Sequence, residues 1–498
     1  MAFLYGFSAT KLQDFIFRTN VLQEIIGASE IIKSIDSLGK DLQGFFSKNG
    51  INLNKNPEII LTSAGNLRAI FDDEADLQKV VLHLPKLIAK HSYGLGVAQA
   101  VVKYGGDYAS ATSLLESKLK IASNKLDFPL DFSHCILKHN PKTALPQAPN
   151  TQSDDKYRKI DKSTFQKLQA FDNFDKTNAN SKPNTDSTKE LKELKNAKNK
   201  IALIYADGNA LGNIVRTLSK DEMKSFSTAL DNATKEAFAK SHTQIKDKYG
   251  EIKIREVICG GDDLVVVCNA DIALDFAKAF LAHFENLTRN IHKGKNLTAC
   301  AGIAFFNHKY PIHYALKLAK DLCKEAKSHS KALDLTNPPS SLMFHNIQSS
   351  AVQSFSTFID DELSLGANQG KEHIVRLDFG AYFLRDISKS NAPKPTPNPT
   401  IENLQNVVEI FRESSAPTSR LRQWLSMLDS SKNLADNELK QIAKIYAAFA
   451  TNHNSALQNL HKDLSLSNLI IQKDEFSKTP IYDIISLISN TAQVSKIK

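Results

Sequence analysis

The chain has 498 residues, a length that predicts roughly two to four domains. Hydrophobic residues make up 42%, as in proteins with sizeable cores, and no apolar run has the length of a membrane span. The net charge of +9 agrees with a polyanionic partner such as nucleic acid or nucleotides, although lysine-rich proteins also carry such an excess without one. No signal-peptide pattern and no C-x-x-C pair among the five cysteines are present, so we expect a cytoplasmic protein without a zinc ribbon or a disulfide framework.

Residues 1–110 predict a first compact unit. The expected elements are a strand (3–8), a long helical segment (10–46) with a break near Gly27, a hairpin (58–65 and 66–72), a helix (74–92) and a strand (95–104). The order β-α-β-β-α-β is that of a ferredoxin-like fold. Residues 111–200 are expected to be an insertion, mostly a solvated linker rich in Pro, Asn and Lys, with a helix at Ser163–Phe171.

Residues 201–345 repeat the order β-α-β-β-α-β. The expected elements are a strand (201–208), a helix (219–242) with a capping box at Ser219 and Glu222, a hairpin (251–268), a helix (271–291), a strand (296–306) and a helix (311–331). After Pro339 the pattern becomes mixed, with strands expected at 341–347 and 374–384. Residues 346–400 are expected to form a mixed segment that ends in a Pro-rich linker at 391–400. Residues 401–498 predict a helical C-terminal domain, which makes the fold class α+β.

The strongest candidate for a functional site combines Asp207, at the end of a strand, with the Gly260-Gly261-Asp262-Asp263 turn. In a β-α-β-β-α-β sheet the first strand neighbours the hairpin, so the three carboxylates can meet. Clustered carboxylates repel one another unless a cation lies between them, and Mg²⁺ accepts carboxylates and substrate phosphates together. A turn alone is modest evidence, since Gly and Asp favour turns for their own reasons. Asp207 in the right position makes a metal site with bound triphosphate the better interpretation.

Further residues fit phosphate binding. Gly208 and Gly212 flank a loop whose backbone N–H groups are expected to hold phosphates at the start of a helix. Lys327 is expected to bring a positive charge to a triphosphate, and its alternative interpretation is a surface lysine beside Glu325.

Several segments resemble the large polymerase-like subunit of type III CRISPR effector complexes. Its catalytic palm is similar to "LIYADGNALGNIV", "REVICGGDDLVVVC", "TACAGIAFFNHKYPIHYALKLAKDLCKEAKSHSK" and "SLMFHNIQSS". Its other palm, which lacks the acidic turn, resembles "YGFSATKLQDFIF", "GASEII" and "SAGNLRAIF". The resemblance implies two ferredoxin-like palm (nucleotide cyclase-like) domains followed by a helical C-terminal domain.

Family members with an intact acidic turn join ATP through 3′–5′ linkages into cyclic oligoadenylates that activate downstream effectors. The resemblance therefore implies a nucleotidyltransferase of antiviral defence that uses Mg²⁺ or Mn²⁺. Its catalytic and metal-binding residues would be Asp207, Asp262 and Asp263. Its nucleotide-binding residues would be Gly208, Asn209, Gly212, Gly260, Gly261 and Lys327.

The sequence also departs from this family. Asn209 stands where many members have an acidic residue, no histidine–aspartate nuclease domain precedes the first palm, and Cys135 is the only cysteine between the palms, where the family binds zinc. We therefore expect no DNA cleavage by that route, and a shortened, stand-alone relative is an alternative to a subunit of the complex.

Two other functions stay open. A dinucleotide cyclase would use nearly the same chemistry, but Leu264 follows Asp263 in place of phenylalanine, and no Arg-x-x-Asp motif precedes the turn. A non-catalytic scaffold or sensor that binds RNA or nucleotides agrees with the basic charge and with Asn209. The expected partners are ATP or other nucleoside triphosphates and no membrane, with RNA, guide-RNA complex subunits and a second copy of the chain left open.

Overall fold

The computed structural model describes most of the chain. The described ranges are 2–125, 137–148, 159–181, 188–292, 296–348, 355–365, 374–386, 399–430, 432–472 and 476–492. The region around Cys135 and the Pro-rich stretch 391–398 lie outside them. Among the described helices none is long and apolar enough to cross a membrane. The chain divides into two compact units, and the domain limits drawn from the sequence stay predictions.

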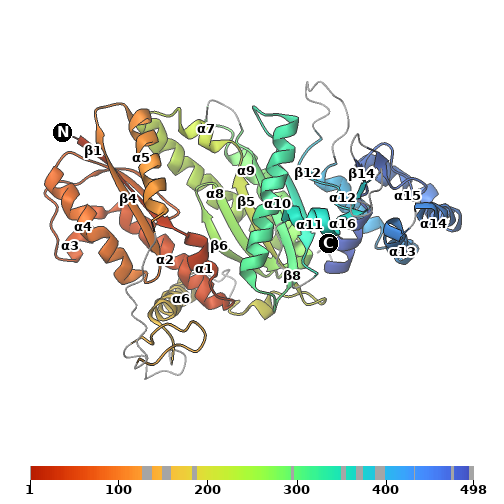
Figure 1. Ribbon diagram of the computed structural model, residues 1–498, viewed down its shortest axis with the longest axis horizontal. Coiled ribbons are helices and arrows are strands. Elements are labelled where there is room, and N and C mark those ends of the chain that lie inside the picture. Colours follow the sequence, from red (N-terminus) through yellow and green to blue (C-terminus); the bar gives the residue numbers. More distant parts are fainter. Residues whose placement is uncertain are drawn as a thin grey trace. The chain divides into compact units, whose positions relative to one another are not determined.

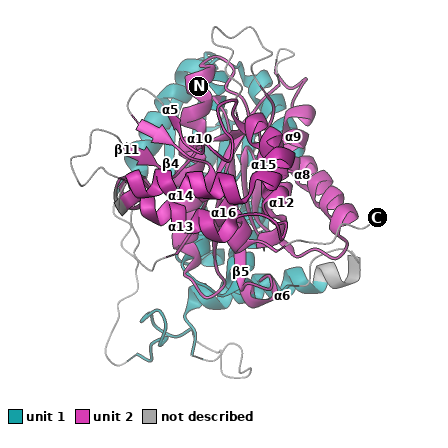
Figure 2. Cartoon of the chain, turned by 90° about the vertical axis from the view of Figure 1, so that its right-hand side faces the viewer, with its two compact units in different colours: residues 1–190, 211–232 teal, residues 191–210, 233–498 magenta. Residues whose placement is uncertain are grey.

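Unit 1 comprises residues 1–190 and 211–232 and is teal in Figure 2. Its elements are β1 (Ala2–Thr10), α1 (Leu12–Phe17), α2 (Leu22–Lys40), α3 (Leu42–Lys48), β2 (Glu58–Ser63), β3 (Asn66–Phe71), α4 (Glu74–His91), β4 (Gly96–Tyr104), α5 (Tyr108–Ser123), α6 (Lys162–Ser181) and α7 (Leu211–Val215), together with the first part of α8. The sheet has the antiparallel order β2-β3-β1-β4. This is the ferredoxin-like order that the sequence predicts.

The predicted break at Gly27 is wrong. Gly27 lies inside α2, and the helical segment is interrupted instead between α1 and α2 and again at Asp41, which caps α3. Gly27 allows α2 and α6 to pack closely, because a Cβ at this position would lie 1.7 Å from the carbonyl oxygen of Lys167 in α6. The helix expected at Ser163–Phe171 is present as the longer α6, which packs on α2 and is therefore not a solvated linker.

Unit 2 comprises residues 191–210 and 233–498. The elements of its palm-like part are β5 (Lys200–Gly208), α8 (Lys220–Tyr249, whose first part belongs to unit 1), β6 (Ile254–Gly260), β7 (Asp263–Asn269), α9 (Ala273–Leu287), β8 (Ala299–Asn307), α10 (Ile312–Leu333) and β9 (Ser341–Asn346), with 3₁₀ turns at Leu191–Glu193 and Ala270–Ile272. The sheet also includes β12 (Tyr382–Phe383), and its strand order β12-β9-β8-β5-β7-β6 contains the ferredoxin-like order once more, as β8-β5-β7-β6. The strand β9 is added parallel to β8.

The sequence explains why β5 is central and why α10 covers the sheet. Four consecutive residues of β5, from Ile201 to Ile204, are buried, as expected for a strand that is covered on both faces. The buried side chains of α10 recur at helical spacing, with Ala315, Ala319, Leu322 and Ala326 among them. In Figure 1 α10 lies beside β5 and β8, and it contacts both strands.

The rest of unit 2 is a mixed segment followed by helices. Its elements are α11 (Phe355–Glu362), β10 (Ser364–Leu365), β11 (Ile374–Arg376), β12 (Tyr382–Phe383), α12 (Ile401–Ile410), α13 (Thr418–Ser430), α14 (Lys432–Ile445), α15 (Ala447–Leu460), β13 (Ile471–Gln472), β14 (Phe476–Lys478) and α16 (Ile481–Asn490). The single strand expected at 374–384 is wrong, because the chain turns at Gly380, which has φ +104°. As a result β11 pairs with β14, whereas β12 pairs with β9.

Candidate active site at the ends of strands β5, β6 and β7

Asp207 and Asp263 meet because their strands are neighbours. In the antiparallel ladder of β5 and β7, Ala206 pairs with Leu264, so Asp207 and Asp263 come next on the two strands. Gly260 pairs with Asp263 at the end of the β6–β7 hairpin, which leaves Gly261 and Asp262 as the turn. The local sequence thus places three carboxylates at one edge of the sheet, as predicted.

The turn is held in a defined shape. Gly261 has φ +61°, and Asp262 is not among the residues with positive φ, the pattern of a type II′ hairpin turn with glycine in its first position. The hydroxyl of Thr234, a fully buried residue of α8, donates a hydrogen bond to the carbonyl oxygen of Gly261 at 2.6 Å. The turn is therefore fixed from the helix side as well as by the strands.

The three carboxylates interact strongly. Burial raises the pKa of Asp262 to about 7, and the charges of Asp263 and Asp207 and a hydrogen bond with the Asp207 side chain add to the increase. Burial and the charge of Asp207 also raise the pKa of Asp263, while the hydrogen bond from Tyr205 and the charges of Lys327 and Lys320 oppose that increase. The Tyr205 hydroxyl donates to Asp263 Oδ1 at 2.9 Å. The pKa of both residues is thus raised despite the two nearby lysines, so the lysines do not fully compensate burial and the repulsion between the carboxylates.

Lys327 reaches the cluster from α10. Its ammonium lies 2.7 Å from Asp207 Oδ2 and donates to the carbonyl oxygen of Gly208, also at 2.7 Å. The interpretation of Lys327 as a surface lysine beside Glu325 is therefore wrong, since its side chain is only 18% exposed and points to the strand end.

Asn209 follows directly on β5 and is buried, with 4% of its surface exposed. Its backbone N–H donates to the carbonyl oxygen of Thr298, and its Nδ2 donates to Thr298 Oγ1 at 3.0 Å. The Thr298 hydroxyl in turn donates to the carbonyl oxygen of Pro338, which fixes the orientation of the amide. The Oδ1 atom of Asn209 has no hydrogen-bond partner among the described residues.

The predicted glycines have different surroundings. Gly208 and Gly260 lie in paired strands, and Gly261 forms the turn. Gly212 lies in the short helix α7 of unit 1, and a Cβ at this position would meet nothing within 4 Å. No close contact therefore requires glycine at position 212.

The chemistry of the site fits a divalent cation. Among the residues that the structure describes, no three acidic, histidine or cysteine side chains are arranged around one point as metal ligands. Burial and the charge of Asp207 raise the pKa of Asp262 and of Asp263, and carboxylates are hard oxygen donors of the kind that Mg²⁺ or Mn²⁺ prefers. Asp207, Asp262 and Asp263 are the residues that would hold such an ion.

Sequence reasoning missed three residues around the carboxylates. Tyr205 could have been found, because it lies two residues before Asp207 and so faces the same side of the strand. Thr234 and Thr298 give no local signal, since each reaches the site from an element that is distant in sequence.

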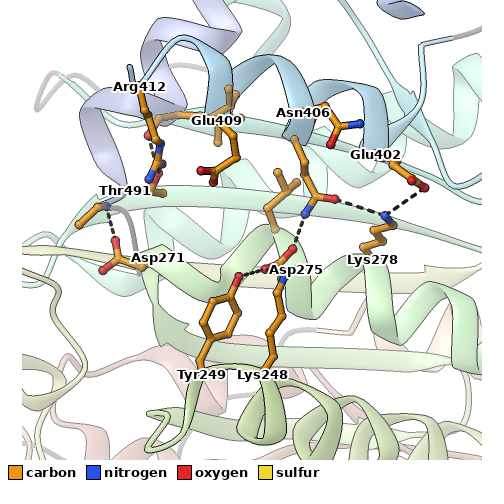
Figure 3. Close-up of a pocket in the computed structure, with 15 residues that line it drawn as sticks. Lys248, Tyr249, Asp271, Asp275, Lys278, Glu402, Asn406, Glu409, Arg412 and Thr491 are labelled. Carbon is orange, nitrogen blue, oxygen red and sulfur yellow. Dashed lines mark hydrogen bonds and ion pairs between the residues drawn. The ribbon is translucent and has the colours of Figure 1, made fainter. Parts of the chain in front are cut away.

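A polar cavity lies elsewhere in unit 2, between α9 and α12. It has a volume of about 580 Å³ and is lined by none of the three carboxylates. Figure 3 shows the side chains of Lys248 and Tyr249 converging on Asp275, which also accepts a hydrogen bond from Gln405 of α12. Lys278 likewise pairs with Glu402. The charged side chains of this cavity thus connect the palm-like part to the helices.

Comparison with known proteins agrees with this architecture. Residues 200–333 match the model of the Cas10/Cmr2 family's second palm domain. None of the curated proteins matches the chain. Among solved structures, the Csm1-Csm4 cassette in complex with cA3 aligns with a TM-score of 0.52 and 14% identity, covering 99% of this chain and 70% of the other. The same cassette in complex with one ATP gives 0.51 and 14%, with the same coverage.

A third structure, the apo Csm1-Csm4 cassette, aligns with a TM-score of 0.43 and 14% identity, and the match covers 68% of this chain. There the chain spans about half of the matched protein, 53% of its length.

The repeated ferredoxin-like order, the acidic hairpin and the helical C-terminal region define a palm-type α+β protein. Within this class the chain has a Cas10-like palm at residues 200–333, which confirms the resemblance to the large subunit of type III CRISPR complexes.

Proposed function

We propose that the chain is a nucleotidyltransferase that makes cyclic oligonucleotides, specifically cyclic oligoadenylate from ATP, as a signal in antiviral defence. The observation that carries the proposal is the group of three carboxylates at adjoining strand ends, in which burial and mutual repulsion raise the pKa of Asp262 to about 7. Such a group is costly to maintain unless it binds cations.

In the proposed reaction, the 3′-oxygen of one nucleotide attacks the α-phosphorus of another. The bond between the α-phosphorus and the bridging oxygen breaks, pyrophosphate leaves, and the hydroxyl proton is lost to solvent. Two divalent cations at the carboxylates would lower the pKa of the attacking hydroxyl and neutralise the leaving pyrophosphate. A final transfer within the same chain of nucleotides closes the ring.

The chain's own residues hold the site in shape. Tyr205 fixes the orientation of Asp263, and Thr234 fixes the turn through the carbonyl of Gly261. Gly261 presents no side chain, so a triphosphate can approach the backbone of the turn. Lys327 supplies a positive charge beside Asp207.

The comparisons support the choice of substrate. The second-palm match covers all three carboxylates, and the similar Csm1-Csm4 cassettes were solved with ATP and with cA3. Subunits of a guide-RNA complex, RNA and a second copy of the chain are proposed partners. The cytoplasm is the proposed location, in agreement with the four buried free cysteines, among them Cys259 and Cys268.

Asn substitution of both turn carboxylates tests the proposal. Asp262→Asn with Asp263→Asn keeps the side-chain size and removes the cation ligands, so pyrophosphate release from ATP with Mg²⁺ or Mn²⁺ should fall roughly 100-fold or more. Mass spectrometry of the products from mixed nucleoside triphosphates identifies base and ring size. A matched control, Asp221→Asn with Asp247→Asn, removes two exposed carboxylates from α8 and should keep full activity. Unchanged turnover in the folded double mutant would rule the proposal out.

A non-catalytic sensor of the same fold is the second candidate. The observation in its favour is the ion pair between Lys327 and Asp207, because this carboxylate already has a positively charged partner. Nucleotide binding without any product after long incubation with ATP, GTP and Mg²⁺ or Mn²⁺ would favour the sensor.

A further inference from the structure

The ammonium of Lys327 bridges two consecutive residues at the end of β5. It is 2.7 Å from the Asp207 carboxylate and 2.7 Å from the Gly208 carbonyl oxygen. Both contacts use oxygen atoms, and oxygen atoms are also what a hard cation requires. The ammonium of Lys327 therefore lies where a cation bound to Asp207, the carboxylate on β5, would lie.

The position of Lys327 is set by its helix. Its neighbours on α10, Cys323, Ala326 and Ser330, are almost fully buried, so the backbone of Lys327 is anchored against the sheet. Only the four-carbon side chain is free to change its direction, and a lysine ammonium on such a stem adopts new positions readily. The ion pair is partly exposed, with 18% of the lysine side chain and 30% of the aspartate side chain accessible, so solvent can take over its contacts.

An ammonium and a divalent cation compete at such a site. Both are attracted by the same three carboxylates and repel each other at short range. A divalent cation that binds Asp207 must therefore displace Lys327 from the carboxylate. Breaking the ion pair makes the free energy of cation binding less favourable, so the cation binds more weakly. Once displaced, the ammonium is available to the negatively charged triphosphate that arrives with the cation.

We propose that Lys327 is a built-in counterion that occupies Asp207 in the metal-free protein and sets the divalent-cation concentration at which the site loads. This inference rests on the proposed function, because it assumes that Asp207 is a metal ligand. Lys327 is thus a positioning residue before it is a phosphate-binding residue.

Mn²⁺ binding to the full-length protein, measured without nucleotide by the electron paramagnetic resonance signal of free Mn²⁺, tests the inference independently of turnover. Lys327→Met removes the competing ammonium, so Mn²⁺ should bind roughly two- to fivefold more tightly than to the wild type. Lys327→Arg keeps the charge and the pairing with Asp207 and should bind Mn²⁺ no more tightly than the wild type. Lys327→Gln serves as a second neutral variant if the methionine protein folds poorly.

Lys320 provides the matched control for a mere change of net charge. It lies on the same helix, 5.7 Å from the Tyr205 ring centroid, and its charge acts on Asp263. Lys320→Met removes the same charge, and its effect on Mn²⁺ affinity should be clearly smaller.

Equal gains in Lys320→Met and Lys327→Met would overturn the inference, because they would reflect net charge alone. Unchanged or weaker Mn²⁺ binding in Lys327→Met, beside measurable binding in the wild type, would overturn the inference and leave the proposed function intact. Absence of Mn²⁺ binding in the wild type and in both neutral variants would overturn the proposed function as well.

Discussion

At the scale of single residues, Asn209 combines burial with a side-chain oxygen that has no hydrogen-bond partner among the described residues. A buried acceptor without a donor costs about 1–3 kcal/mol, and native structures rarely leave one unused. The Asn209 Oδ1 atom is such an acceptor among the described residues, and the Thr298 network prevents the amide from turning to pair it. Because Asn209 follows Asp207 by two residues along the strand direction, we expect this oxygen to accept a hydrogen bond from the bound nucleotide or to contact its cation.

Asn209→Ala is therefore expected to affect function more than stability. The substitution loses one hydrogen bond to Thr298, at a cost of about 1 kcal/mol in the free energy of unfolding. It also removes the oxygen that we expect to contact the ligand, so kcat/KM for ATP should fall roughly tenfold or more. Urea unfolding and steady-state kinetics measure the two effects. A large loss of stability with unchanged kinetics would show that Asn209 is only structural.

Residue identity was the part of the site that could be predicted best. Asp207, Asp262 and Asp263 follow from strand order, because adjacent strand ends must meet. The pairing of Lys327 with Asp207 does not follow, since a helix that is distant in sequence brings the lysine there. The orphaned oxygen of Asn209 depends on Pro338 and Thr298, which no local pattern connects to it.

At the scale of elements, helix α8 stabilises the acidic turn. Thr234→Val keeps the shape of the side chain and removes the hydroxyl that donates to Gly261. The carbonyl of Gly261 then loses this hydrogen bond, which costs about 1 kcal/mol. The turn should become more mobile, and we expect kcat to decrease with little change in KM, which steady-state kinetics with ATP can measure.

Thr234→Ser is the control for this prediction, because it restores the hydroxyl and should recover most of the activity. Equal losses of activity in the valine and serine variants would contradict a role for the hydrogen bond.

The elements also show why sequence patterns lose accuracy at their ends. The helix expected to end at residue 242 continues to Tyr249, because Ala237, Ser241 and Ile245 form one buried stripe. Ser241 interrupts the apolar pattern, yet its hydroxyl donates within the helix and permits its burial.

At the scale of the whole molecule, Asp483 links the C-terminal helices to the sheet of unit 2. It lies on α16 and accepts hydrogen bonds from the Tyr382 hydroxyl at 2.7 Å and from the backbone of Phe379. Burial raises the pKa of Asp483 to about 8; Asp378 adds to this increase, and the Tyr382 bond and Lys478 oppose it. The folded protein therefore holds a proton at neutral pH that an unfolded aspartate, with a pKa of about 3.9, has released.

This protonation makes stability depend on pH in a defined direction. The contribution is complete below pH ~4 and decreases as the pH rises from there to about 8, because the unfolded state binds fewer protons over that range. Asp483→Asn keeps the hydrogen-bond acceptor and cannot ionise. In thermal scans at about pH 5.5 and about pH 8.5, its unfolding midpoint should therefore fall less with rising pH than that of the wild type. The exposed Asp247→Asn should behave as the wild type, and equal pH slopes in all three proteins would contradict the prediction.

The duplicated ferredoxin-like order could be predicted from the succession of strands and helices alone, and both sheets confirm it. The division of the chain could not. Residues 211–232 belong to unit 1, although the strand before them, β5, belongs to unit 2. Such an exchange depends on contacts between distant segments, which periodicity does not encode.

This interleaving limits how the protein can be dissected in the laboratory. No single cut yields either unit, because a fragment ending at residue 190 lacks α7 and the first turns of α8, while a fragment starting at residue 191 retains them without the rest of their unit. To isolate the second palm-like part, residues 211–232 would therefore have to be replaced by a designed connection. Limited proteolysis faces the same constraint, since separating the units requires cuts on both sides of residues 211–232 as well as one near residue 190.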